Sequence, residues 1–204
     1  MRRTLRDVYE LLSGLPDISG FPLRALMAGI AMAESSGDPN AWVPHDPPSN
    51  PKASPSSGLY QVHQAAWPEI YEETERVRRS APSDEAKIVR MTELARPIMA
   101  DALAAAGTAT RTLSLRGIAV NPLNTALFVD AAWQAGAGHL ARWASSTRSG
   151  DPRGIVNAKR TVEVEVALRR LAADVLEVAS DASVAFGVLA AFAIVGLVLF
   201  QLDV

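Results

Sequence analysis

Short apolar runs separated by glycine and proline predict a series of helices in the first third of the chain. Leu5–Leu12 is expected to form a short helix, and a stronger one opens near Pro22, because proline is tolerated in the first helical turn. Its apolar positions are nearly continuous, as in a helix buried on most sides: Leu23, Leu26, Met27, Ile30, Ala31 and Ala33. Gly37 and Pro39 predict its end, so Glu34 is expected in the last turn.

The middle of the chain is expected to alternate loops with two further helices. Residues 43–57 hold five prolines among polar residues, which predicts a loop. Residues 83–106 have apolar positions at helical spacing, and Gly107 is expected to end this helix. Residues 108–120 read as a loop, and the Asn-Pro start of residues 121–136 predicts another helix.

The C-terminal quarter has a different pattern. Glycine, aspartate and proline at 149–152 indicate a boundary after a domain of residues 1–150. Within residues 151–181, predicted as an amphipathic juxtamembrane helix, apolar positions fall at heptad spacing: Val164, Leu168, Leu171, Val175 and Val178, continuing to Ala182. Residues 182–202 are 21 residues without a charge, enough to span a bilayer as a transmembrane-like helix. A buried core helix is the alternative.

Composition narrows the chemistry that is possible. The chain of 204 residues has no cysteine, which removes disulfides, thiolate nucleophiles and Cys-ligated zinc. Its 20 Lys and Arg against 22 Asp and Glu give no basic surplus for a nucleic-acid backbone, so no nucleic-acid partner is expected. The three histidines are scattered and form no HExxH motif. We therefore expect neither a metal site nor a cofactor.

Glu34 is the candidate for catalytic chemistry because it places a carboxyl group at an apolar helix end. Burial disfavours an ionised carboxylate, and the helix C-terminus adds about half an elementary negative charge nearby. Both effects are expected to raise the pKa of Glu34. A carboxylic acid that stays protonated near neutral pH is what protonation of a glycosidic oxygen requires. Most glutamates near a helix end are solvated surface residues, so the neighbouring motifs decide whether Glu34 is interpreted as catalytic.

Three sequence blocks occur in a fixed order: Glu34-Ser35-Ser36-Gly37-Asp38-Pro39-Asn40-Ala41, Ser56-Ser57-Gly58-Leu59-Tyr60-Gln61-Val62 and Ala131-Ala132-Trp133-Gln134-Ala135-Gly136. This order resembles the soluble lytic transglycosylase and goose-type lysozyme-like family. There a helix-ending Glu-Ser precedes a Gly-Leu-Met-Gln-like turn and an Ala-Tyr-Asn-Ala-Gly helix end. The resemblance covers roughly residues 20–145, and it implies a mainly α, lysozyme-like domain (α+β with minimal β).

The resemblance also implies a role for each block. Glu34 is the implied catalytic acid and base. Implied substrate-binding residues come from all three blocks: Ser35, Ser57, Gly58, Tyr60, Gln61, Ala132, Trp133 and Gln134. Gly58 would let the backbone pass close to the sugar, and Ala132–Gln134 would form the far wall of a groove. Trp133 and Gln134 replace the family's Tyr and Asn, and Tyr60 replaces its Met, which adds a polar tip and a surface for sugar stacking.

The implied reaction is cleavage of peptidoglycan between N-acetylmuramic acid and N-acetylglucosamine. Glu34 would protonate the bridging oxygen and then accept the proton of the muramic C6 hydroxyl as a 1,6-anhydro ring closes. A retaining hydrolase needs a second carboxylate about 5 Å away and an inverting one a carboxylate at about 6.5–9.5 Å. Asp38 and Asp46 lie in no motif that fixes them opposite Glu34, which favours a lytic transglycosylase over a muramidase-type hydrolase.

The ends of the chain suggest where such an enzyme would act. The N-terminal MRRTLRDVYELL lacks the apolar core and cleavage site of a secretory signal. Together with the apolar residues 182–202, this predicts a virion-associated phage enzyme for local cell-wall penetration during genome entry, held by a lipid membrane. Two alternatives stay open: an inactive peptidoglycan-binding or virion-assembly module of the same fold, and a homo-oligomer or virion-protein contact through the 164–182 seam.

Overall fold

A computed structural model of the chain describes residues 3–13, 23–45, 53–120 and 122–152, together with Ile155 and Val164. It is mainly helical with little strand, which confirms the mainly α fold class. The described part does not include the transmembrane-like segment predicted at 182–202. It includes only four residues of the juxtamembrane helix predicted over 151–181. Within the residues that the structure does describe, no helix combines the length and apolar character needed to cross a bilayer.

The chain divides into two compact units, which we describe separately. The first comprises Met1–Leu15 and Met27–Pro97, and the second comprises Pro16–Leu26 and Ile98–Val204. The first unit contains α1 (Leu5–Leu11), most of α2 (Leu23–Ser35), a small sheet and α3 (Pro68–Ser80). The helices predicted near Leu5 and Pro22 are thus both present.

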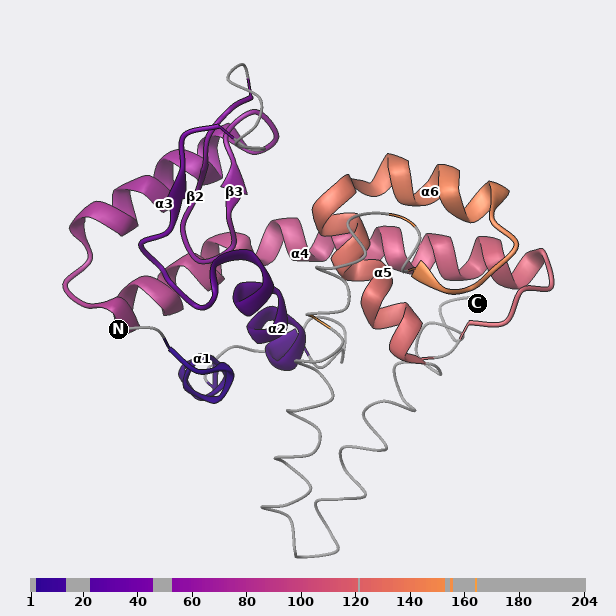
Figure 1. Cartoon of the computed structure of the whole chain (residues 1–204), viewed down its shortest axis with the longest axis horizontal. Helices are drawn as coiled ribbons and strands as arrows, with labels where there is room; N and C mark the ends of the chain where they lie inside the picture. Colours follow the sequence, from indigo (N-terminus) through magenta and orange to yellow (C-terminus); the bar gives the residue numbers. More distant parts are fainter. Residues whose placement is uncertain are drawn as a thin grey trace, which may run out of the picture. The chain divides into compact units, whose positions relative to one another are not determined.

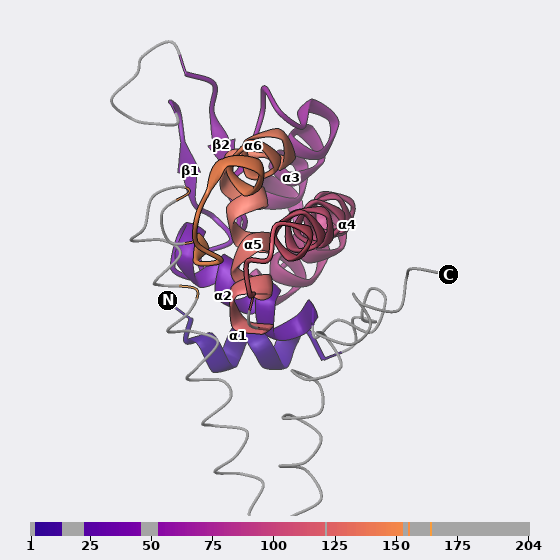
Figure 2. The same ribbon diagram turned by 90° about the vertical axis from the view of Figure 1, so that its right-hand side faces the viewer.

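The sheet of the first unit has three two-residue strands in the order β1-β2-β3. The strands β1 (Trp42–Val43), β2 (Ser56–Ser57) and β3 (Val62–His63) pair antiparallel, with Ser57 opposite both Trp42 and Val62. Figure 2 shows β1 beside β2, and α3 packs along β2 and β3 in Figure 1. The loop predicted over 43–57 is therefore wrong at its two ends, where prolines are absent and strand pairing is possible.

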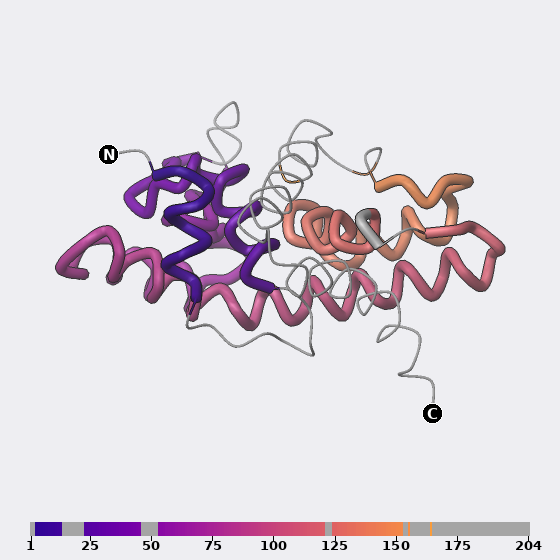
Figure 3. The backbone as a smooth tube through the Cα atoms, turned by 90° about the horizontal axis from the view of Figure 1, so that it is seen from below, coloured from indigo at the N-terminus to yellow at the C-terminus, as the bar shows by residue number. Residues whose placement is uncertain are grey.

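Helix α4 (Asp84–Leu115) is 32 residues long and runs uninterrupted through Gly107 (Figure 3). The predicted end at Gly107 and the predicted loop over 108–115 are therefore wrong. Buried positions continue at helical spacing on both sides of that glycine: Ala102, Ala106, Ala109 and Leu113. An interior glycine destabilises a helix by only about 1 kcal/mol relative to alanine, and burial on this face outweighs that penalty.

The helix ends instead at Leu115, two residues before Gly117, whose φ of 73° is the left-handed conformation that favours glycine. The amide of Ile118 donates to the Leu113 carbonyl at 2.9 Å, which satisfies a carbonyl group that the helix would otherwise leave without a partner. A glycine at this position is the usual C-terminal stop. The sequence therefore contained the correct stop, ten residues beyond the one we predicted.

The second unit also contains α5 (Pro122–Ala135) and α6 (Ala137–Ser146), which pack against each other (Figure 1). Helix α5 agrees with the prediction for residues 121–136, whereas α6 was not predicted. The rings of Phe128 on α5 and Trp143 on α6 meet edge to face with centroids 5.5 Å apart. This contact places Trp143 in the packing between the two helices.

Candidate functional site

The end of α2 positions Glu34, the candidate acid. The helix ends at Ser35, so the prediction that Glu34 lies in the last turn is confirmed. Two consecutive residues then adopt positive φ, Ser36 at 56° and Gly37 at 73°, and turn the chain away from the helix axis. Glu34 is half-buried there. The raised pKa expected for this carboxyl group stays a prediction.

Ser35 connects the end of α2 to the second sequence block. Its hydroxyl donates to the Leu59 carbonyl at 2.8 Å and lies 3.0 Å from the Ala31 carbonyl one helical turn back. Leu59 is fully buried, so its carbonyl needs a partner inside the protein. The first and second blocks are therefore in direct contact, through two residues that are 24 positions apart in the sequence.

The loop after α2 is tied down from α4. The side chain of Asn40 accepts a hydrogen bond from the Lys87 ammonium at 2.6 Å and donates to Asp84 at 3.0 Å. The Gly58 amide donates to the Ala41 carbonyl at 2.8 Å. The segment that follows Glu34 is thus fixed both to the start of α4 and to the turn between β2 and β3.

That turn, residues 58–61, is closed by the side chain of Gln61. Gln61 has a φ of 46°, its amide nitrogen donates to the Gly58 carbonyl at 2.9 Å, and its amide oxygen accepts from the Ser56 hydroxyl at 2.8 Å. Both ends of the amide thus have partners within the hairpin. The structure therefore gives Gln61 a role in shaping the turn, and its predicted contact with a sugar stays a prediction.

Gly58 occupies a position where a side chain has no room. Its φ is +76°, and an added Cβ would lie 2.6 Å from Cγ2 of Thr74 on α3 and 3.0 Å from the sulfur of Met91 on α4. The turn therefore packs closely against both helices at this point. This packing alone requires a glycine at position 58. The requirement does not depend on the close approach to a sugar that the resemblance implies.

Tyr60 belongs to the core of the first unit. Its side chain is 1% exposed, and its hydroxyl lies 2.8 Å from the Thr92 hydroxyl, which in turn donates to the Ile88 carbonyl at 2.7 Å. Burial raises the pKa of the Tyr60 hydroxyl well above its ordinary value. This differs from the stacking surface that we expected, because the ring is covered by the protein itself.

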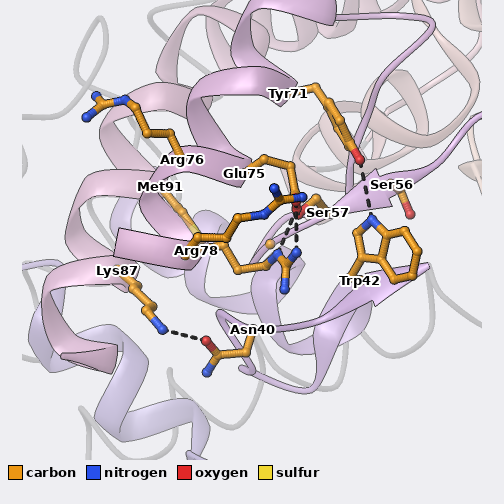
Figure 4. A network of polar contacts seen from close by, with 12 residues as sticks. Asn40, Trp42, Ser56, Ser57, Tyr71, Glu75, Arg76, Arg78, Lys87 and Met91 are labelled. Carbon is orange, nitrogen blue, oxygen red and sulfur yellow. Dashed lines mark hydrogen bonds and ion pairs between the residues drawn. The ribbon is translucent and has the colours of Figure 1, made fainter. Parts of the chain in front are cut away.

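Ser57 is part of a buried charged cluster on the α3 side of the sheet (Figure 4). Its hydroxyl donates to Glu75, and the Glu75 carboxylate also accepts from Arg78 at 2.7 and 2.8 Å and from Arg79 at 2.7 Å. Glu75 is only 7% exposed. The hydrogen bonds from Arg78, with those from Ser57 and Arg79, lower the pKa of Glu75 to about 2, although desolvation opposes the shift.

Sequence reasoning missed the importance of Glu75. Glu75 pairs with Arg78 and Arg79, three and four positions further on, and this spacing is typical of an exposed helical face. The burial was not foreseen. Its signal was Tyr71, Thr74 and Glu75 at helical spacing, which are the side chains by which α3 faces the hairpin.

Trp42 on β1 was also overlooked. Its side chain is 48% exposed, and its indole N–H donates to the hydroxyl of Tyr71 at 3.3 Å (Figure 4). Tyr71 itself is buried on α3. Trp42 is therefore a large apolar side chain that is both oriented by the protein and open to solvent.

The third sequence block lies on α5, in the second unit. Ala132 is buried, whereas Trp133 and Gln134 are half-buried. The Gln134 amide donates to the buried carboxylate of Asp130 at 2.8 Å, one helical turn back. Gln134 therefore has a hydrogen-bonding role within α5, and the groove wall expected from this block stays a prediction.

Neither a metal site nor a relative emerges from the described part of the chain and the comparisons. Among the residues that the structure describes, no group of three or more His, Asp or Glu side chains is placed to hold a metal ion. No family model, curated protein or solved structure matches the sequence or the fold. The function is therefore inferred from the residues themselves.

Proposed function

We propose that the chain is a peptidoglycan lytic transglycosylase in which Glu34 acts as the single acid and base. The observation that carries the proposal is the 2.8 Å hydrogen bond from the Ser35 hydroxyl to the Leu59 carbonyl. It holds the helix end that carries Glu34 against the turn at residues 58–61. Two of the three blocks that resemble the lytic transglycosylase family are thus in direct contact, although they are distant in sequence.

The proposed reaction needs a carboxyl group that first donates and then accepts a proton. Glu34 would protonate the oxygen between N-acetylmuramic acid and N-acetylglucosamine, so that this bond breaks through an oxocarbenium-like transition state. The resulting carboxylate would take the proton of the muramic C6 hydroxyl as its oxygen bonds to C1. The products are a free N-acetylglucosamine 4-hydroxyl and a 1,6-anhydro end, and Glu34 is protonated again.

Glu75 is poorly suited to the role of acid in this reaction. Its pKa of about 2 keeps it ionised near neutral pH, and Ser57, Arg78 and Arg79 occupy its oxygens. A carboxylate that stays ionised and is already bonded at both oxygens has no proton to donate to a glycosidic oxygen, so Glu75 is not the acid of this reaction.

The test is mass spectrometry of intact sacculi digested with the full-length protein. We expect muropeptides with 1,6-anhydro ends, because ring closure replaces attack by water. Glu34→Gln should abolish their release, while Glu72→Gln, a matched change at an exposed glutamate on α3, should leave it unchanged. Reducing ends in place of anhydro ends would identify a muramidase-type hydrolase. Equal release by wild type and Glu34→Gln would contradict the role of Glu34.

A second candidate is a peptidoglycan-binding or assembly module of the same fold without turnover. The observation that favours it is the internal use of side chains expected to bind substrate: the polar groups of Ser57, Tyr60 and Gln61 all have partners within the first unit. A wild-type protein that co-sediments with sacculi but releases no muropeptides would support this module and contradict the enzyme.

The apolar residues 182–202 support a further part of the proposal, attachment to a lipid membrane. In a helical conformation, 21 uncharged residues would span roughly 30 Å at 1.5 Å per residue, close to the thickness of a bilayer core. Flotation of the full-length chain with liposomes, compared with a chain lacking residues 182–202, tests this attachment. Homo-oligomers that persist without liposomes and require residues 164–182 would favour the assembly alternative.

A further inference from the structure

Trp42 combines exposure with a fixed orientation. Tryptophan is highly buried on average in proteins, yet the Trp42 side chain is 48% exposed. Its indole N–H donates at 3.3 Å to the hydroxyl of Tyr71, a residue that is buried on α3. Little rotational freedom remains to be lost when another molecule covers this indole, which is the condition for tight contact at low entropic cost.

A series of hydrogen bonds and strand pairing connects Trp42 to the end of α2. The Ser35 hydroxyl donates a hydrogen bond to the Leu59 carbonyl. The amide of the neighbouring Gly58 donates to the carbonyl of Ala41, the residue before Trp42. Trp42 then pairs with Ser57 at the edge of the sheet, since β1 is an outer strand. The exposed indole is thus built into the same framework that holds the helix end carrying Glu34.

We propose that Trp42 is a stacking platform for a pyranose ring of a glycan strand, at a subsite separate from the bond that is cleaved. A flat indole presents an electron-rich face, and a pyranose presents one face of C–H groups that complements it. The inference deepens the proposed function and rests on it for the identity of the glycan. It assigns to Trp42 the stacking role that the buried ring of Tyr60 does not provide.

A subsite separate from the cleaved bond predicts which kinetic parameter Trp42 affects. A contact made equally in the ground state and the transition state contributes to KM and leaves kcat unchanged. A platform away from the cleaved bond also requires a substrate long enough to reach it. Trp42→Ala should therefore impair binding of long glycans and have little effect on short ones.

The experiment measures binding and turnover separately with the full-length chain. Binding of a hexamer and a dimer of N-acetylglucosamine is followed by saturation-transfer NMR in the Glu34→Gln protein, which prevents cleavage. We expect Trp42→Ala to weaken hexamer affinity by about tenfold. In the protein that retains Glu34, Trp42→Ala should raise KM for isolated glycan strands by a similar factor and change kcat by less than about twofold.

Three further variants separate stacking from general effects. Trp42→Phe retains a flat ring and should keep hexamer affinity within about threefold of wild type. Trp42→Leu retains apolar bulk without a flat face and should behave like Trp42→Ala. Leu115→Ala removes the other large apolar side chain that is exposed among the described residues, at 83%, and should change nothing. Thermal melting of each variant shows that it is folded, and Trp42→Phe keeps the test decisive if Trp42→Ala does not fold.

The outcomes distinguish this inference from the proposed function. Wild-type cleavage of sacculi with an unchanged KM and hexamer affinity in a folded Trp42→Ala protein would overturn the platform and leave the enzyme in place. Hexamer binding that depends on Trp42, without cleavage, would overturn the enzyme and support the platform. If instead no glycan binds and Trp42→Ala reduces self-association in light scattering, the indole is a contact between copies and the platform is overturned.

Discussion

The Ser35 hydroxyl donates to the Leu59 carbonyl at 2.8 Å, which joins the last residue of α2 to the turn between β2 and β3. The Leu59 carbonyl belongs to a fully buried residue, and the same hydroxyl also lies 3.0 Å from the Ala31 carbonyl. One small side chain therefore satisfies a buried backbone group and fixes the position of the residue beside Glu34. This gives a physical reason for a serine directly after the candidate acid.

Replacing Ser35 with alanine should destabilise the first unit. The change leaves the buried Leu59 carbonyl without its side-chain partner, and such a loss costs about 1–2 kcal/mol in the free energy of unfolding. Urea denaturation monitored by circular dichroism measures the difference from wild type.

Ser145→Ala is the matched control for this change. The Ser145 hydroxyl donates to the Ala141 carbonyl one turn back at 2.9 Å, and the residue is exposed on α6. Alanine is also the better helix former, so the unfolding free energy should stay within about 0.5 kcal/mol of wild type. Equal effects of the two substitutions would show that the contact with Leu59 contributes nothing.

The Glu75 cluster should make stability depend on acid pH. The pKa of Glu75 in the folded protein is about 2, below its ordinary value near 4.5, so the folded state favours the ionised form. Its contribution is fully present above pH 4.5 and is lost as the pH falls toward 2. Glu75→Gln should therefore be less stable than wild type near neutral pH, by on the order of 2 kcal/mol once exposure of Arg79 to solvent is taken into account.

Denaturation curves at pH 7, 5, 4 and 3 test this dependence. The difference between wild type and Glu75→Gln should shrink below pH 4.5 as the wild-type carboxylate takes up a proton. Glu73→Gln is the control, because the ion pair of Glu73 with Arg76 is about half exposed and should contribute little. A difference between wild type and Glu75→Gln that stays constant from pH 7 to pH 3 would contradict the depressed pKa.

Tyr60→Phe separates a core role from a substrate-binding role. Removing the hydroxyl takes a partner from Thr92, which still donates to the Ile88 carbonyl, so we expect a loss of about 1 kcal/mol in unfolding free energy. Because the ring is 1% exposed, KM for glycan strands should not change. An increase in KM of several fold, measured from muropeptide release, would instead show that the hydroxyl reaches the substrate.

Periodicity and helix-end residues predicted the backbone around the candidate acid correctly. Near-continuous apolar positions from Leu23 and the breakers Gly37 and Pro39 are local signals, and they gave α2 and its last turn. The wrong helix end predicted at Gly107 arose because the true end depends on tertiary packing and not on a local signal. Glycine was read as a stop, whereas burial of a long alanine-rich face, which depends on tertiary packing, carried α4 on to Leu115.

The roles of individual side chains were harder to predict than the backbone. Glu75 and Tyr60 are polar and amphipathic residues whose burial depends on how α3 and α4 pack against the hairpin. Trp42 is the reverse, an aromatic residue that the packing leaves exposed. Apart from the helical spacing of Glu75 with Tyr71 and Thr74, no pattern along the chain distinguishes these outcomes, because each depends on contacts between segments that are far apart in sequence.

A comparison of Gly58 with Gly117 separates the effect of backbone strain on stability from the effect of packing. Both adopt positive φ, +76° and +73°, so an alanine is strained at either position. At Gly58 the new Cβ would also lie 2.6 Å from Thr74 and 3.0 Å from Met91, whereas at Gly117 nothing lies within 4 Å.

Gly58→Ala should accordingly be much the more damaging of the two substitutions. Strain alone predicts a loss of about 1 kcal/mol for Gly117→Ala. For Gly58→Ala the clash with two helices adds to the strain, for a total of roughly 3 kcal/mol. Urea denaturation of both variants measures the two losses. Similar losses would mean that the hairpin can move away from α3 and α4, and the close approach of a sugar would then be the remaining reason for glycine in this turn.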